Sequence, residues 1–513
     1  MLHLQERTRQ GASWALLVAI AVPNAVLPQP TLSYRFEAAG RPHSLRIELT
    51  LPAPGRREER MLHLPPGPFG PAEELGRQVV ISEVQRGSLK PGPTSATRIL
   101  TGDGSGAPIV IDYELRQAYD GPPADRMRVF WPSIQPEYWY FAATMALVVP
   151  DFEQATEIDL FWEVPAGGGG WKMVSSRGVD LACDPGCQLS FRANDDEELR
   201  GGPSQAVFFT AGNLLVSHVR MQQAGPLAND LYVSLYGVPD YVTDPGAILE
   251  SVQAIVSVHQ DLWRRPVYER FVVNLITFPN QEANNFGGFN GSQAFSSFVP
   301  QRSLPVWEGG LLPAVDRGRL LAHIAHEYGH TWLRPELFDL EPSEQPRLLW
   351  FTEGISEFVA DQVLLSAGLL DEQAAVDRAN EKLRRDFELF RQARNALSED
   401  IVARFWGDYG LQRQPYLRGY LLALNWNARI RAQSGGGSLF LDFVKQLVDE
   451  ASGAPLSEEA LYARSEAFLE GGIRADVQRH WVDGRTISPD PTSFGPCFGL
   501  VEKAGIPQFE PVC

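Results

Sequence analysis

Residues 320–361 read LLAHIAHEYGHTWLRPELFDLEPSEQPRLLWFTEGISEFVAD. Within this stretch His326, Glu327 and His330 form the pattern H-E-x-x-H, and Glu353 follows in a second apolar segment. On a helix, His326 and His330 lie one turn apart on the same face, about 5–6 Å from each other. This spacing allows both imidazoles to bind one zinc ion at about 2.0–2.1 Å.

The two glutamates of this stretch complete a catalytic zinc site. Glu353 is the natural third ligand, and a water molecule takes the fourth position. Glu327 is adjacent to a ligand but points in another direction, so it can accept a proton from that water. We therefore predict one Zn²⁺ per chain with a general base beside it. A purely structural zinc site is a weaker interpretation, because such sites usually close with four protein ligands.

Two simpler interpretations of the histidines are a surface helix and a core helix with hydrogen-bonded imidazoles. Against both, three of the chain's nine histidines, His323, His326 and His330, fall within eight residues. Apolar residues flank them at helical spacing, which predicts a helix with one buried face. These observations favour a zinc hydrolase.

The composition is that of an ordinary globular protein. The 513 residues are enough for about three domains, with 44% apolar and 21% charged residues. A formal net charge of −18 argues against a nucleic-acid partner. The sequence leaves the oligomeric state open.

The first 25 residues have the pattern of a signal peptide. Arg7 and Arg9 precede an apolar run over residues 12–22, and Ala19-Ile20-Ala21 offers a cleavage site, with Ala25 as a second choice. The run is about half the roughly 20 residues that a membrane span needs. We therefore expect a periplasmic or extracellular protein without a stable membrane span after cleavage. An uncleaved anchor is the alternative.

Four cysteines are consistent with export, because disulfides persist in oxidising compartments. An even number favours two disulfides, and the most local pairing is Cys183–Cys187 with Cys497–Cys513. Three pairings are open, and sequence alone does not choose among them.

Short β-like segments separated by Pro- and Gly-rich turns predict a β-sandwich or saddle-like domain over residues 30–200. The expected strands are Leu32–Glu37, Ser44–Leu51, Val79–Gln85, Ile109–Leu115, Met127–Trp131, Tyr138–Val148 and Ile158–Val164. An acidic run at residues 194–198, followed by Gly201-Gly202-Pro203, indicates the domain boundary; a surface loop is the alternative. We expect a catalytic domain over residues 204–370, a helical lobe over 371–484 and a disulfide-closed tail over 485–513.

Three stretches resemble the glycyl aminopeptidase family of gluzincin metallopeptidases, which are related to aminopeptidase N and thermolysin. They are HEYGHTWLRPELFDL from His326, LLWFTEGISEFVADQVLLSAGLL from Leu348, and PYLRGYLLAL from Pro415. The likeness is strong over residues 320–430 and weak over 32–487. It implies an α+β multidomain protein, in which a β-rich N-terminal domain precedes a thermolysin-like zinc-peptidase domain with a mainly α-helical C-terminal lobe.

The resemblance also implies residue roles in an enzyme that hydrolyses peptides or proteins. His326, His330 and Glu353 become zinc ligands, and Glu327 becomes the general base. Tyr416 becomes the hydrogen-bond donor to the tetrahedral oxyanion. A donor of this kind is worth about 3 kcal/mol. Glu357, one turn after Glu353, can hydrogen-bond a ligand histidine; a solvent-facing charge is the alternative.

This chain departs from the family pattern in three places, one of which is Gly329, where an aromatic residue is common. Family members carry Gly-Gly-x-Glu where this chain has a loop with Gly287, Gly288, Phe289 and Asn290. The family's glutamate pairs with the free α-amine of the substrate, whereas Asn290 is neutral. An aminopeptidase is expected, with a secreted endopeptidase or a catalytically silent peptide-binding protein as alternatives. In addition, the residues after the catalytic region are too few for the PDZ domain that usually follows.

Overall fold

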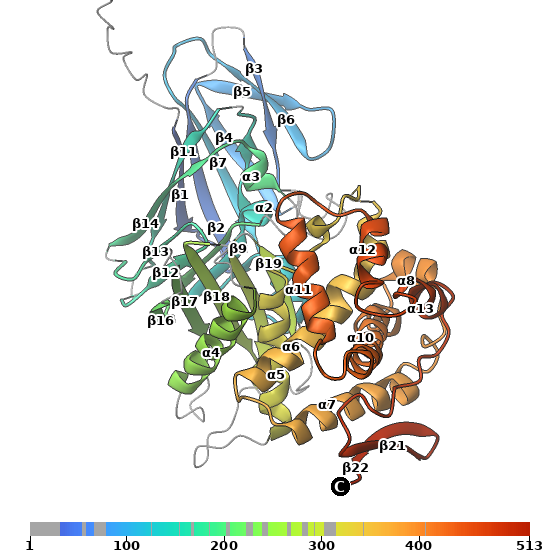
Figure 1. The fold of residues 1–513 in the computed structure, drawn as a ribbon. Coiled ribbons are helices and arrows are strands. Elements are labelled where there is room, and N and C mark those ends of the chain that lie inside the picture. Colours follow the sequence, from blue (N-terminus) through green and yellow to red (C-terminus); the bar gives the residue numbers. More distant parts are fainter. Residues whose placement is uncertain are drawn as a thin grey trace, which may run out of the picture.

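The structure is a computed structural model (Figure 1). It describes residues 31–513 apart from 54–57, 66–77, 125, 153, 166–168, 184, 202–205, 222–228, 239–244, 264–267, 280–285, 292, 302–313, 342 and 406. The predicted signal peptide, residues 1–25, lies outside the described residues. Within the described residues, none of the helices combines the length and apolar character that crossing a membrane requires.

The N-terminal region is built from three sheets (Figure 1). The first sheet has the order β14 (Gly186–Ala193), β11 (Thr156–Glu163), β1 (Thr31–Ala38), β2 (Ser44–Leu51), β7 (Ile109–Arg116) and β4 (Val79–Gln85). The second has β10 (Val149–Pro150), β3 (Glu59–His63), β6 (Thr97–Gly102) and β5 (Gly87–Pro91). The third has β13 (Gly178–Asp180), β12 (Lys172–Ser175), β15 (Phe208–Gly212), β9 (Tyr138–Ala142) and β8 (Ser133–Ile134).

Alternating side chains explain why these segments form strands around a common core. Along β1, Leu32, Tyr34 and Phe36 are buried while the residues between them are more exposed, which is the two-residue period of a strand. Phe36 stacks on Trp162 of β11 with ring centroids 4.8 Å apart. The buried Tyr34 hydroxyl donates to the carbonyl oxygen of Val148 at 2.9 Å, so its polar atom is satisfied.

Two of the expected strands are wrong in whole or in part. Met127–Trp131 lies in and just after a 3₁₀ helix, η1 (Arg126–Phe130), which has buried side chains at Val129 and Phe130 and contacts the fourth sheet described below. Tyr138–Val148 is a strand only to Ala142, where the helical turn α2 (Ala143–Ala146) begins. Every residue of 138–148 is buried, so alternation could not separate strand from helix there, and Ala and Met favour helix.

One strand of the third sheet, β15, lies after the expected domain boundary in the sequence. A short helix, α3 (Glu197–Arg200), occupies the acidic run, but β15 then pairs with β9 and β12. We therefore propose that the N-terminal region continues to about residue 214 instead of ending near residue 200.

A fourth sheet separates the N-terminal region from the helices. Its order is β16 (Leu215–Met221), β17 (Asn229–Tyr236), β18 (Arg270–Phe278), β20 (Ala294–Pro300) and β19 (Gly287–Gly291). Along β18, Val273 and Leu275 face the helical core, whereas Val272 and Ile276 face the N-terminal core. Both faces are thus buried, which makes the sheet a rigid wall for the helices that pack on it. The expected loop at residues 287–290 is the edge strand β19.

The helices form the rest of the catalytic region (Figure 1). α4 (Pro245–Trp263) and α5 (Ala314–Gly329) pack on the fourth sheet through a shared core. The segments that follow are η4 (Pro335–Leu337), η5 (Gln345–Leu348), a π-helical turn η6 (Trp350–Ile355), α6 (Ser356–Ser366), α7 (Glu372–Arg384), η7 (Arg385–Leu389), α8 (Ser398–Arg404), α9 (Tyr409–Gln412), α10 (Gln414–Gln433), α11 (Phe440–Ala451), α12 (Glu458–Ser465), α13 (Arg474–Asp476) and η8 (Val477–Val482). The tail ends in a hairpin, β21 (Phe498–Lys503) and β22 (Ile506–Pro511).

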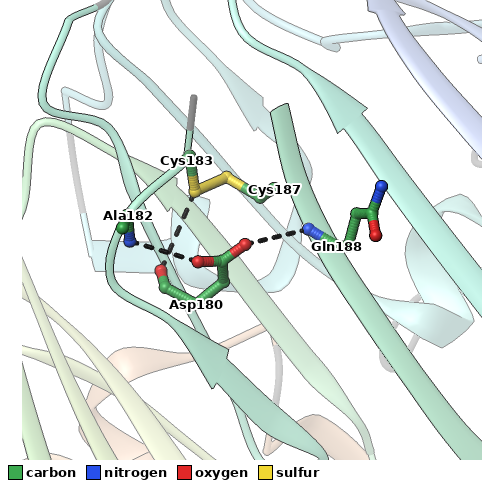
Figure 2. The surroundings of a disulfide bond; sticks show 5 residues. All are labelled: Asp180, Ala182, Cys183, Cys187 and Gln188. Atoms are coloured by element: carbon green, nitrogen blue, oxygen red, sulfur yellow. Dashed lines mark hydrogen bonds between the residues drawn. A yellow bond between two sulfur atoms is a disulfide. The ribbon is translucent and has the colours of Figure 1, made fainter. Parts of the chain in front are cut away.

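Both expected disulfides are present. Cys183 and Cys187 are joined across a sequence separation of four, and beside the disulfide the Asp180 carboxylate accepts the backbone N–H groups of Ala182 and Gln188, each at 3.1 Å (Figure 2). Cys497–Cys513 closes the C-terminal hairpin. These bonds are local, so each one restrains only its own loop.

Two glycines let η6 and α10 touch backbone to backbone. A methyl group on Gly419 would lie 2.0 Å from the carbonyl oxygen of Trp350 and 2.7 Å from Cα of Gly354. A methyl group on Gly354 would lie 2.4 Å from Cα of Gly419. No side chain larger than hydrogen fits on either side of this crossing.

We predict that Gly419→Ala destabilises the protein by about 3 kcal/mol or more, because the clash is with backbone and cannot be relieved by a side-chain rotation. Thermal unfolding measures the change. Gly318→Ala is the matched control, since its methyl group meets no atom closer than 3.8 Å in the middle of α5. That variant should gain about 1 kcal/mol from helix propensity. Equal melting temperatures for the two variants would contradict the prediction.

Candidate metal centre and active site

The end of α5 brings the motif residues together. His326 and Glu327 belong to its last turn, and His330 follows directly, with its N–H donating to the His326 carbonyl oxygen at 3.3 Å. His326 is 4% exposed. α5 contacts both β19 and α6, and His326 and His330 line the cavity described below.

Three ligand atoms converge with the spacing of a metal site. Nε2 of His326 lies 3.0 Å from Nε2 of His330, and Oε2 of Glu353 lies 3.3 Å and 3.5 Å from these two atoms. Zinc bonds of about 2.0–2.1 Å in a tetrahedron would separate ligand atoms by roughly 3.3 Å. Two imidazole nitrogens and a carboxylate oxygen are also ligands that zinc accepts. The residues present thus fit a zinc ion.

Polar groups lie on the far side of both imidazoles, as a hydrogen bond for His330 and as a longer contact with a carboxylate for His326. Nδ1 of His330 lies 3.1 Å from the carbonyl oxygen of Leu333, a contact that places the proton on Nδ1 and frees Nε2 for a metal. Nδ1 of His326 faces Oε1 of Glu357 at 3.8 Å. Glu357 is itself held by Lys382 Nζ at 3.1 Å and by Arg413 at 3.7 Å.

Electrostatics favour charged groups at this centre. Burial alone would lower the pKa of His330, but the charges of Glu353 and Glu327 raise it to about 9. Burial alone would raise the pKa of Glu353, but His330 and His326 hold it well below its usual range. Without metal, the cluster therefore holds a proton on His330 at neutral pH, and a metal ion that binds here displaces it.

Glu327 lies against the edge strand β19. A methyl group on Gly288 would sit 2.0 Å from Oε1 of Glu327 and 2.1 Å from its Cδ, so the carboxylate occupies space that only glycine leaves open. Burial raises the pKa of Glu327, with His326 and His330 opposing the shift. Asn290 does not reach the carboxylate, because its amide donates to the backbone carbonyl oxygen of Glu327 at 2.6 Å.

Tyr416 approaches from α10. The centroid of its ring lies 5.6 Å from that of His326, and the guanidinium carbon of Arg413 lies 4.0 Å from the same centroid. Burial, followed by the nearby charge of Glu353, raises the pKa of Tyr416 well above its usual value. The phenol therefore stays protonated near neutral pH and can act as a hydrogen-bond donor.

All the sequence-predicted site residues line one cavity of about 460 Å³. Sequence reasoning missed the cations Lys382 and Arg413, which hold Glu357, and it left His323 without a role. The cluster of three histidines was a signal for His323. Lys382 lies in a helix with many charged residues, a composition typical of a solvent-exposed face. Its sequence context therefore gave no indication that it contacts the active site.

A second group of metal-binding residue types lies in the N-terminal region. His63, Asp151 and Asp196 place one donor atom each within 4.8 Å of the others. However, Arg200 contacts both aspartates, so the protein already supplies a cation there. His326, His330 and Glu353 are thus the better metal centre among the described residues.

Comparisons with known proteins agree with this geometry. Residues 319–414 match the family model of the M61 glycyl aminopeptidases. The resemblance predicted from sequence is confirmed. With it, the prediction of a zinc metallopeptidase is confirmed. None of the curated proteins matches the chain.

Solved structures share the fold. An aminopeptidase N family protein from Idiomarina loihiensis matches with a TM-score of 0.71 and 16% identity over 89% of this chain and 77% of its own. An M1 zinc metallopeptidase from Deinococcus radiodurans matches with a TM-score of 0.52 and 15% identity over 90% and 94%. A mutant of that enzyme bound to a Tyr-Ser-Ala substrate matches with a TM-score of 0.50 and 14% identity over 90% and 95%. The expected α+β multidomain fold is confirmed.

We predict a graded loss of zinc affinity when the three glutamates are changed one at a time to glutamine. Glu357→Gln should cost about 10–100-fold, as expected for a residue behind a ligand, and Glu353→Gln should cost more. Glu327→Gln should bind zinc almost as tightly as the wild type. Competition with a chromogenic chelator measures all three proteins after metal removal. Wild-type affinity in Glu353→Gln would contradict the ligand assignment.

Proposed function

We propose that the protein removes N-terminal residues from peptides by hydrolysis at a zinc centre formed by His326, His330 and Glu353. The observation that carries the proposal is the convergence of their three donor atoms, 3.0–3.5 Å apart, in the cavity that Glu327 and Tyr416 also line. A zinc ion held there would supply Lewis acidity and would lower the pKa of a bound water to about 7.

The protein's own groups then move the proton. Glu327 accepts it from the attacking water and delivers it to the amine that leaves. Burial raises the pKa of Glu327, which makes its carboxylate a stronger base than an exposed one. General acid–base catalysis of this kind contributes roughly 10²–10⁴-fold to the rate.

Tyr416 stabilises the oxygen that becomes negative when the peptide carbonyl is attacked. Its hydroxyl proton stays in place because its pKa is raised. Arg413 restrains the ring through a cation–π contact at 4.0 Å. A preorganised donor of this kind stabilises the transition state more than the substrate, which is what raises kcat.

An endopeptidase is the second candidate, and Asn290 is the observation that favours it. The family's glutamate at this position would attract a free α-amine, but Asn290 carries no charge and its amide already binds the Glu327 carbonyl. Free-amine recognition would have to come from another group. An endopeptidase does not need such recognition, because its substrates extend past the site on both sides.

We also propose that the protein is exported. The disulfides Cys183–Cys187 and Cys497–Cys513 support this, because disulfides are rare in reducing compartments.

Cleavage of two substrate sets by the zinc-loaded protein tests the activity. One set is Gly-, Ala- and Leu-arylamides with free amines, and the other is N-blocked peptides with internal quenched fluorophores. We expect chelator-sensitive turnover of the arylamides, with kcat reduced about 10²–10⁴-fold in Glu327→Gln. Turnover of the blocked peptides would instead identify an endopeptidase. Turnover of neither set, with zinc bound, would overturn the proposal.

We predict that Gly288→Ala lowers kcat by at least about 100-fold, because the new methyl group displaces the Glu327 carboxylate. Zinc content should stay at that of the wild type, because the three atoms nearest to the new methyl group all belong to Glu327 and none belongs to a zinc ligand. Metal analysis and single-substrate kinetics on the same preparation measure both quantities. Wild-type kcat in this variant would mean that Glu327 is not the base.

A further inference from the structure

His323 lies on the same face of α5 as the general base, one turn earlier. Its Nδ1 is 3.6 Å from Oε1 of Glu327, and both side chains are 13% exposed. Exposed pairs of this spacing on helices contribute only a few tenths of a kcal/mol. This pair instead lines the active-site cavity and is mostly buried, so its two side chains have less freedom to separate than an exposed pair has.

The other edge of the His323 ring is anchored to the catalytic sheet. Its Nε2 lies 2.7 Å from Oγ of Ser297, a fully buried residue of β20. Oγ of Ser297 also lies 3.1 Å from the carbonyl oxygen of Gly287 in β19. The ring of Phe286 stacks on the imidazole with centroids 5.1 Å apart and planes 15° from parallel. The ring therefore has one orientation, with Nδ1 toward Glu327.

The hydrogen-bond pattern places a proton between His323 and the base. When Ser297 donates to Nε2, a neutral imidazole carries its proton on Nδ1. When Ser297 donates to Gly287 instead, Nε2–H donates to Oγ, and Nδ1 carries a proton only in the imidazolium ion, which forms an ion pair with the carboxylate. Nδ1–H therefore points at Oε1 of Glu327 in the first arrangement and in the imidazolium form of the second.

We propose that His323 is a positioning residue for the general base. Ser297 and Phe286 fix the imidazole, and its Nδ1–H attracts the nearer carboxylate oxygen of Glu327 across 3.6 Å, which leaves the other oxygen to exchange the proton. Gly288 borders the same carboxylate, because a methyl group there would lie 2.0 Å from Oε1 of Glu327. The carboxylate of Glu327 is thus bordered by the imidazole of His323 and by Gly288 of β19. This inference rests on the proposed peptidase function.

Three variants of His323 and one of Ser297, in the full-length, zinc-loaded protein, separate positioning from packing. An asparagine amide reaches the place of Nδ1, so His323→Asn keeps the donor to Glu327. A glutamine amide reaches the place of Nε2, so His323→Gln keeps the contact with Ser297 and loses the one with the base. His323→Phe keeps the stacking on Phe286 and loses both the hydrogen bond with Ser297 and the polar contact with Glu327. Ser297→Ala removes the anchor alone.

We expect kcat to fall about 10–100-fold in His323→Gln and His323→Phe, as for other residues that orient a functional group, and less than about fivefold in His323→Asn. KM and zinc content should stay at wild-type values in all three. The acid limb of the kcat/KM profile should move to higher pH in the Gln and Phe variants, because the ionised base loses a donor. Ser297→Ala should move it in the same direction by less.

Other results would overturn the role proposed for His323. Wild-type kcat in His323→Phe, or equal kcat in the Asn and Phe variants, would overturn the positioning role while leaving the peptidase function intact. Loss of zinc from every variant would show that His323 only supports the fold. A wild-type protein without chelator-sensitive turnover would overturn the peptidase function and this role with it.

Discussion

The backbone contact between Gly354 and Gly419 is the constraint on which the catalytic centre depends. Gly354 follows the ligand Glu353, and Gly419 lies one turn after Tyr416. Because a methyl group on either glycine would clash with backbone, the two segments have one separation and one register. The third ligand and the oxyanion donor are thus placed relative to each other by main chain, which deforms less than side chains do. The π-helical geometry of η6 at this point is a feature often found at functional sites.

Side chains of alternating charge extend outward from the metal centre. Behind His326 lies Glu357, behind Glu357 lies Lys382, and behind Lys382 lies Asp361 at 3.5 Å, which also binds Arg378 at 2.8 Å. Each buried charge has an opposite neighbour, so none of them is left uncompensated in a low dielectric. The carboxylates near the histidines can therefore remain ionised, as metal binding and base catalysis both require.

The sequence predicted the parts of the site that a local pattern encodes. His326, Glu327, His330 and Glu353 occupy a motif whose spacing on a helix is set by geometry, and the structure brings them together. The contacts of His323 and Asn290 were not predictable, because their partners Ser297 and Glu327 belong to other elements. Likewise, η1 was mistaken for a strand, and β15 fell outside the expected domain. Their assignments depend on which sheet they meet, and sequence periodicity does not contain that information.

The C-terminal hairpin has a consequence for the order in which the protein assembles. Asn380 of α7 binds both backbone groups of Phe509 in β22, at 2.9 Å and 2.7 Å, across 129 residues of chain. The same helix carries Lys382, two residues along. A growing chain must therefore extend well past α7 before the outer side of this helix is covered, and contacts between such distant segments form slowly. During synthesis, the motif on α5 therefore exists well before the contacts between α7 and the C-terminal hairpin can form.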